Sequence, residues 1–312
     1  MHDDQPSLPQ ALIKMKAFFA LSRTPHGIID LATPALSALL WLGHFPAPDV
    51  VFVGLITAFA GYTAVYALND ITDYRIDKDK IMTCGLSVQA SDIDGVFVRH
   101  PIAQGIITFR AGLIWAGLWA LVALIGATWL NPFCALIFSA GCFLEFIYCK
   151  LFQISKWRAL ISGIVKTLGG MAAIYAVDHQ PSPLFLCAIF LWIFVWEIGG
   201  QNIPNDWTDE QEDLTMKAKT IPVQFGKDIS SLIIVVTLVL SVILNFFIFH
   251  LSPIRLSWFT IVVTMGVSSY FLLYPAYRLY RIKSSQEASA LFNKASYYPL
   301  SLLIALIIGF TA

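Results

Sequence analysis

The chain has 312 residues, of which 57% are hydrophobic and 13% are charged, and its formal net charge is zero. A soluble domain carries about 25% charged residues. This composition therefore argues against a soluble protein and predicts an integral, multi-pass membrane protein. The balanced charge gives no indication of a nucleic-acid partner.

The N-terminal stretch MHDDQPSLPQALIKMKAFFALSRTP begins with acidic residues and lacks a long apolar core. These features are not typical of a cleaved signal peptide. We interpret residues 1–26 as a cytoplasmic or interfacial segment, and residues 27–312 as one intramembrane domain. The five cysteines show no paired spacing of a metal site and are interpreted as small packing residues.

Apolar runs long enough to cross a bilayer recur along the whole chain. A spanning helix needs about 20 apolar residues, and the sequence predicts an all-α bundle of about nine transmembrane helices. Their expected ranges are 27–43, 50–68, 109–130, 132–149, 159–177, 183–200, 231–251, 256–277 and 297–312.

The loop charges predict the orientation of this bundle. With a cytoplasmic N-terminus, 17 of the 20 Lys and Arg residues lie in the inner segments, and Arg255 is the one such residue in an outer connection. Lys and Arg favour the cytoplasmic side. We therefore expect the loops after the second and sixth helices to lie in the cytoplasm. The membrane is expected to be a bacterial plasma membrane or its equivalent.

Those two loops carry the same acidic pattern. ALNDITDYRIDKDK follows the second helix and NDWTDEQED follows the sixth, and both contain D-x-x-D-x-x-x-D. Positions i, i+3 and i+7 share one helical face, so each cluster is expected to extend its membrane helix with a stripe of three carboxylates. The six residues are Asp70, Asp73, Asp77, Asp206, Asp209 and Asp213.

Six carboxylates facing one pocket repel each other unless cations neutralise them. Mg²⁺ binds carboxylates together with substrate phosphates, so we interpret the clusters as metal ligands that clamp a diphosphate, with Asn69 adding an amide oxygen. Arg75 lies within the first cluster, and Lys217 and Lys219 follow the second. These cations are candidates for phosphate oxygens that the metal leaves uncovered.

These motifs resemble those of the UbiA superfamily of intramembrane prenyltransferases. NDITDYRID matches the first family motif, and DWTDEQED matches the second at all three acids. RTPHGIIDLATPAL, RHPIAQG and KTIPVQFG resemble the family's steps into the first, third and seventh helices. Three features depart from the family pattern: His100 interrupts the Arg-Pro pair, the loop before it is long, and Tyr148 and Lys150 are only two residues apart.

The resemblance implies a polyprenyl diphosphate donor, Mg²⁺ held by both motifs, and catalysis by the six aspartates. The diphosphate ionises, and an acceptor attacks the allylic cation. The family's Tyr-x-x-x-Lys motif has its counterpart in Tyr148 and Lys150 at shorter spacing, with Lys156 or Arg158 as substitutes. Aromatic faces stabilise cations, and candidates near the motifs are Tyr62, Tyr66, Trp192, Trp196 and Trp207.

The identity of the acceptor is the open part of this interpretation. It is expected to be a small or lipid-like molecule reached from the membrane, and family frequency favours an aromatic acid of quinone synthesis. Alternatives are a cyclase of the same fold that uses no acceptor, and a membrane transporter. A CDP-alcohol phosphotransferase is disfavoured because the chain lacks D-G-x-x-A-R.

Four ionisable residues lie in or near the apolar spans, where charge is costly and faces a cavity or a partner. They are Asp30, Glu145, Lys166 and Glu197. We expect Lys166 and Glu145, on neighbouring helices, to pair with each other. For His26 and His100 a structural role is favoured over a role in substrate binding.

Overall fold

The computed structural model describes residues 10–85, 93, 98–254 and 257–311, and the regular elements of this part of the chain are all helical. The N-terminal half contains α1 (Gln10–Leu21), α2 (Thr24–Asp30), α3 (Ala32–Leu42), α4 (Pro48–Cys84), α5 (Phe109–Leu130), α6 (Pro132–Lys150) and α7 (Arg158–Val177). The C-terminal half contains α8 (Pro183–Trp196), the π-helix η2 (Glu197–Asn202), α9 (Ile203–Thr208), α10 (Glu210–Thr215), α11 (Ile221–Leu251), α12 (Trp258–Ser268), the π-helix η3 (Ser269–Leu273), α13 (Tyr274–Ile282) and α14 (Ser285–Thr311). The all-α prediction is confirmed.

Within the described residues, eight helices are long and apolar enough to cross a membrane. The first of the nine expected spans, 27–43, is instead divided between α2 and α3, which meet at Leu31. Pro34 explains this break, because it has no N–H to donate to the carbonyl of Asp30 and so interrupts the helical hydrogen bonds. The last expected span lies within the longer α14.

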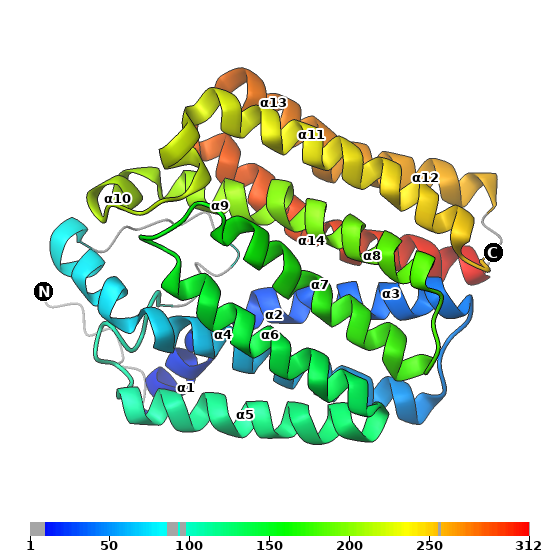
Figure 1. The fold of residues 1–312 in the computed structure, drawn as a ribbon, viewed down its shortest axis with the longest axis horizontal. Coiled ribbons are helices and arrows are strands. Elements are labelled where there is room, and N and C mark those ends of the chain that lie inside the picture. The colour runs from blue at the N-terminus through cyan, green and yellow to red at the C-terminus, as the bar shows by residue number, and fades with distance from the viewer. Residues whose placement is uncertain (1–9, 86–92, 94–97, 255–256, 312) are drawn as a thin grey trace, which may run out of the picture.

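The helices pack into one bundle, and its two halves meet where α8 and η2 contact α7 and where α14 contacts α2 and α3 (Figure 1). In the N-terminal half, α4 packs against α5 and α6, and α7 packs against α6 and α3. Helix α8 packs against α7 and α11, while α14 packs against α3 and α9. Elements from both halves therefore surround the interior of the bundle.

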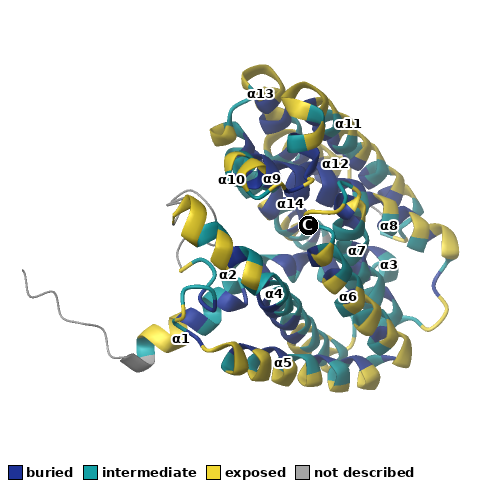
Figure 2. Cartoon of the chain, turned by 60° about the vertical axis from the view of Figure 1, so that its left-hand side comes forward, coloured by how far each residue is buried: buried dark blue, intermediate teal, exposed yellow. Residues whose placement is uncertain are grey.

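Burial in this bundle follows the pattern of a membrane protein. Large apolar side chains are exposed on the outer faces of α5 and α11, including Leu118, Ile125 and Val236 (Figure 2). The most deeply buried aromatic side chains, such as Trp192, Trp196 and Tyr298, lie inside between α8 and α14. The outward apolar surface is suited to lipid, which confirms an integral membrane protein.

Helix α4 places the first aspartate motif. Its 37 residues extend over about 55 Å at 1.5 Å per residue, whereas the hydrocarbon layer is about 30 Å thick. The C-terminal part of α4, with Asp70, Asp73 and Asp77, therefore lies toward one edge of the bundle. Helix α10 lies at the same end, on the left of Figure 1.

Candidate active site

The interior of the bundle contains a large cavity, with a volume of about 590 Å³. All six predicted aspartates line one end of it. The remainder of the lining is mostly apolar and comes from α3, α4, α6 and α7, with side chains such as Leu39, Phe138 and Leu168. A polar end that continues into an apolar pocket is suited to a molecule with a charged head and a hydrocarbon tail.

In the first motif, the carboxylates of Asp70 and Asp77 are both buried and face His100. Nδ1 of His100 lies 3.1 Å from Oδ1 of Asp70 and 2.9 Å from Oδ2 of Asp77. Burial lowers the pKa of His100, but the two carboxylates outweigh this effect and raise it to about 9. The imidazolium therefore neutralises part of the first cluster at neutral pH.

The second motif differs in shape from the prediction. Asp206, Asp209 and Asp213 do not extend one straight helix, because α9 ends at Thr208, and Asp209 (φ −96°, ψ 9°) separates it from α10. The π-helix η2 precedes α9. The three aspartates nevertheless all line the cavity. The prediction that these aspartates form a stripe along one continuous helix is therefore wrong, but their side chains do face the same cavity.

Lys80, a residue that the sequence analysis missed, joins the two motifs. It belongs to α4, and its Nζ lies 2.8 Å from Glu212 and 3.8 Å from both Asp209 and Asp213. Arg99 adds a contact of 3.4 Å to Asp209. Helical spacing offered a signal, because Lys80 follows Asp77 by three residues and therefore shares its face.

Arg158 is the cation that contacts the first aspartate of the second motif. This buried residue begins α7 and lies 3.5 Å from Asp206. Its guanidinium carbon lies 4.1 Å from the ring centre of Tyr148 and 5.0 Å from that of Phe152. The Tyr148 hydroxyl in turn accepts a hydrogen bond of 3.2 Å from Asn202. Stacking and the ion pair together fix the guanidinium at the cavity wall.

Three carboxylate oxygens at this end have no hydrogen-bond partner among the described residues: Oδ2 of Asp70, Oδ1 of Asp73 and Oδ2 of Asp206. All three are buried, and a buried charged oxygen without a partner is costly. The donor set consists of carboxylate oxygens, which Mg²⁺ prefers. The residues present therefore fit a divalent cation between the motifs.

Comparison with protein families agrees with this geometry. The model of the UbiA prenyltransferase family matches residues 31–298. The chain belongs to this family. As a UbiA prenyltransferase it is an enzyme that transfers prenyl groups, which confirms the resemblance seen in the sequence motifs.

Individual relatives extend the comparison over nearly the whole chain. A digeranylgeranylglyceryl phosphate synthase of Thermococcus sibiricus is 24% identical over 292 residues, which cover 90% of this chain and 92% of the relative. Two solved structures share the fold. A UbiA homolog of Aeropyrum pernix K1 has a TM-score of 0.69 at 15% identity, over 91% of this chain and 98% of that chain. A UbiA homolog of Archaeoglobus fulgidus bound to DMAPP and Mg²⁺ has a TM-score of 0.65 at 15% identity, over 92% and 99%.

Several cations predicted as substrate ligands lie elsewhere in this prenyltransferase. Arg75, Lys150, Lys217 and Lys219 are exposed and do not belong to the cavity lining. Lys150 packs over Phe146. The cations that line the polar end are instead Lys80, Arg99, His100 and Arg158.

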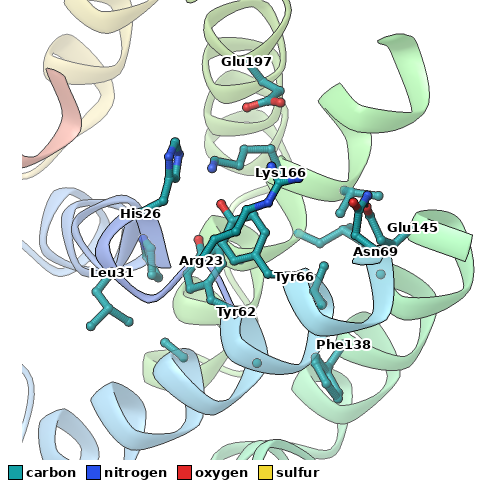
Figure 3. Close-up of a pocket in the computed structure, with 18 of the residues that line it drawn as sticks. Arg23, His26, Leu31, Tyr62, Tyr66, Asn69, Phe138, Glu145, Lys166 and Glu197 are labelled. Atoms are coloured by element: carbon teal, nitrogen blue, oxygen red, sulfur yellow. The ribbon is translucent and has the colours of Figure 1, made fainter. Parts of the chain in front are cut away.

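Asn69 and the predicted aromatic residues lie in different surroundings in the structure. Nδ2 of Asn69 donates to Oε1 of Glu145 at 2.6 Å (Figure 3). Tyr62 and Tyr66 line the cavity, whereas the three tryptophans do not and lie in the buried core: Trp192, Trp196 and Trp207. The tyrosines therefore remain the better candidates for contact with a prenyl cation.

The expected pair of Lys166 and Glu145 does not form. Nζ of Lys166 lies 2.6 Å from Oδ2 of Asp30 instead. Asp30 belongs to α2, which the break at Leu31 separates from α3. Glu145 is already engaged by Asn69.

Proposed function

We propose that this enzyme transfers a prenyl group from a polyprenyl diphosphate to a prenylated glycerol phosphate, with Mg²⁺ held by the two aspartate motifs. The observation that carries the proposal is the convergence of both motifs on one end of a single cavity, whose other walls are apolar. The diphosphate belongs at the carboxylate end, and the hydrocarbon chain belongs in the apolar part.

Six aspartates would hold the metal: Asp70, Asp73, Asp77, Asp206, Asp209 and Asp213. Bound Mg²⁺ supplies charge stabilisation for the departing diphosphate. The side chains of Lys80, Arg99 and Arg158 line the same end and meet phosphate oxygens. The apolar walls keep water away from the allylic centre, so the acceptor reacts in its place.

The glycerol phosphate acceptor is inferred from the relatives, because the Thermococcus sibiricus protein bears the name of a digeranylgeranylglyceryl phosphate synthase. The aromatic acceptor of quinone synthesis that the sequence analysis favoured finds no support among the relatives reported above. We place the motifs on the cytoplasmic side because the inner segments carry most of the Lys and Arg residues.

The test uses purified protein in nanodiscs with labelled geranylgeranyl diphosphate and Mg²⁺. We expect a labelled diether when a geranylgeranyl ether of glycerol phosphate is added, and no product with EDTA. Transfer to a hydroxybenzoate or a naphthoate instead would replace the proposed acceptor. Diphosphate release with Mg²⁺ alone, together with a cyclised hydrocarbon, would identify a cyclase.

A further inference from the structure

A second polar cluster lies in the cavity wall, deeper in the bundle than the aspartate motifs. Its centre is Asp30, which is 1% exposed. Nζ of Lys166 lies 2.6 Å from Oδ2 of Asp30, the hydroxyl of Tyr66 donates to the same oxygen, and Nε2 of His26 lies 3.8 Å from Oδ1. Lys166, Tyr66 and His26 all line the cavity (Figure 3). Asp30 therefore fixes three polar side chains at the cavity wall.

Glu197 contributes a carboxylate to the same region from the first residue of η2 (Figure 3). Its Oε1 accepts a hydrogen bond of 2.8 Å from the hydroxyl of Ser162, whereas its buried Oε2 has no partner among the described residues. The buried hydroxyl of Tyr62 likewise has no hydrogen-bond partner within the described part of the chain. An ionisable group inside a membrane protein is costly and marks a functional site unless a partner satisfies it.

The cluster lies within reach of the diphosphate end. Tyr66 precedes Asp70 by four residues, which is about 6 Å along α4. Glu197 precedes Asp206 by nine residues, roughly 13 Å along the helices. A prenyl diphosphate held at the aspartates would therefore extend its hydrocarbon chain from the motifs toward this cluster.

We propose that the cluster of Asp30, Tyr66, Lys166 and Glu197 binds the reacting head of a hydroxyl-bearing acceptor, and that Oε2 of Glu197 receives the proton of the attacking hydroxyl. This inference rests on the proposed transferase function, because it requires an acceptor. Lys166, oriented by Asp30, donates to an oxygen of the acceptor head. Tyr62 supplies a further hydroxyl on the same wall.

The transfer step balances with these residues. The bond between the first prenyl carbon and the diphosphate oxygen breaks, and its electron pair leaves with the diphosphate. A lone pair of the acceptor hydroxyl forms the new carbon–oxygen bond. The O–H bond breaks with its electrons remaining on oxygen, and the proton passes to Glu197, which becomes a neutral carboxylic acid.

Glu145 is the other glutamate of the cavity wall, and its contacts distinguish it from Glu197. Its Oε1 accepts the hydrogen bond of 2.6 Å from Asn69, and no oxygen of Glu145 is among the buried atoms without a partner. Glu197 therefore carries the glutamate oxygen that a ligand hydroxyl would satisfy.

The test separates prenyl diphosphate binding from transfer. Wild type, Glu197→Gln, Glu197→Asp and Lys166→Met are compared in nanodiscs, with Glu287→Gln as the control. Glu287 pairs with Arg278 outside the cavity. Binding of labelled geranylgeranyl diphosphate with Mg²⁺ is measured first. Then kcat and KM are measured with a geranylgeranyl ether of glycerol phosphate.

We expect Glu197→Gln to bind the diphosphate within about twofold of wild type and to lose roughly 10²–10⁴ in kcat, the usual contribution of a positioned proton acceptor. Glu197→Asp is expected to recover part of this loss. Lys166→Met is expected to raise the acceptor KM by about tenfold, as for a lost charge-assisted hydrogen bond, with a smaller change in kcat.

Wild-type kcat in Glu197→Gln would overturn the inference and leave the proposed function intact. Absence of transfer by wild type with a hydroxyl acceptor would overturn both. If Glu197→Gln fails to fold, Ser162→Ala takes its place, because it leaves the carboxylate but removes the donor to Oε1. In that variant an unchanged kcat would contradict the inference.

Discussion

The imidazole of His100 lies 2.9 Å from the carboxylate of Asp77, and this contact joins the segment that leads into α5 to the first aspartate motif. His100 has a positive φ of 50°, a backbone conformation that costs free energy in a residue other than glycine. Contacts to two buried carboxylates offset that cost. A histidine therefore neutralises the carboxylates that we assign to Mg²⁺.

The imidazolium and Mg²⁺ compete for these oxygens, so His100→Gln should tighten Mg²⁺ binding by about threefold to tenfold. This range corresponds to the loss of an ion pair worth about 1 kcal/mol. Isothermal titration calorimetry of the protein without prenyl diphosphate measures this. His44→Gln, at an exposed histidine, is the matched control. Weaker Mg²⁺ binding in His100→Gln would instead indicate that the imidazole is a metal ligand.

Replacing Asp70 or Asp206 by Asn should abolish transfer while the protein stays folded. Each substitution preserves the size of the side chain but removes a charged metal ligand, and metal ions contribute several kcal/mol to stabilisation of the leaving group. The rate loss should reach about 10³ or more. Asp49→Asn, at the exposed opposite end of α4, is the control. Full activity of either variant would remove the site assignment.

Arg158→Gln should weaken binding of the prenyl diphosphate by about tenfold or more, because the guanidinium lines the cavity and stacks on Tyr148. The same change at Lys150, which is exposed and outside the cavity lining, should have the smaller effect. Equilibrium binding with Mg²⁺ compares the two. A larger loss for Lys150→Gln would favour the cation that the sequence motif indicates.

Gly199→Ala should destabilise the enzyme by about 1–3 kcal/mol, the usual cost of overpacking. A Cβ there would lie 2.1 Å from Oγ1 of Thr237 and 3.2 Å from the carbonyl oxygen of Ile234. Relieving these contacts requires η2 to move. Because Gly199 and Glu197 both belong to η2, Glu197 would be displaced as well. A Cβ added at Gly266 in α12 meets no atom of the described residues within 4 Å, so Gly266→Ala should be neutral or slightly stabilising. Thermal unfolding in detergent measures both, and equal melting temperatures would contradict the packing argument.

The sequence by itself determined the class of the protein and the chemistry of one end of its cavity. Long apolar runs leave few alternatives to membrane-spanning helices, because backbone polar groups must be satisfied within each span. The repeated spacing of Asp70, Asp73 and Asp77 and of Asp206, Asp209 and Asp213 then indicates two carboxylate clusters. Spacing of this kind is local, and a helix turns local spacing into a shared face.

Which partners meet across the bundle was decided only by the tertiary structure. Lys166 pairs with Asp30 and not with Glu145, although α6, which carries Glu145, also packs against α7. Lys80 and Arg158 reach the second motif, while the basic residues nearer to the motifs in sequence point outward. Helix packing fixes such contacts between distant residues, and no spacing along one chain segment encodes them.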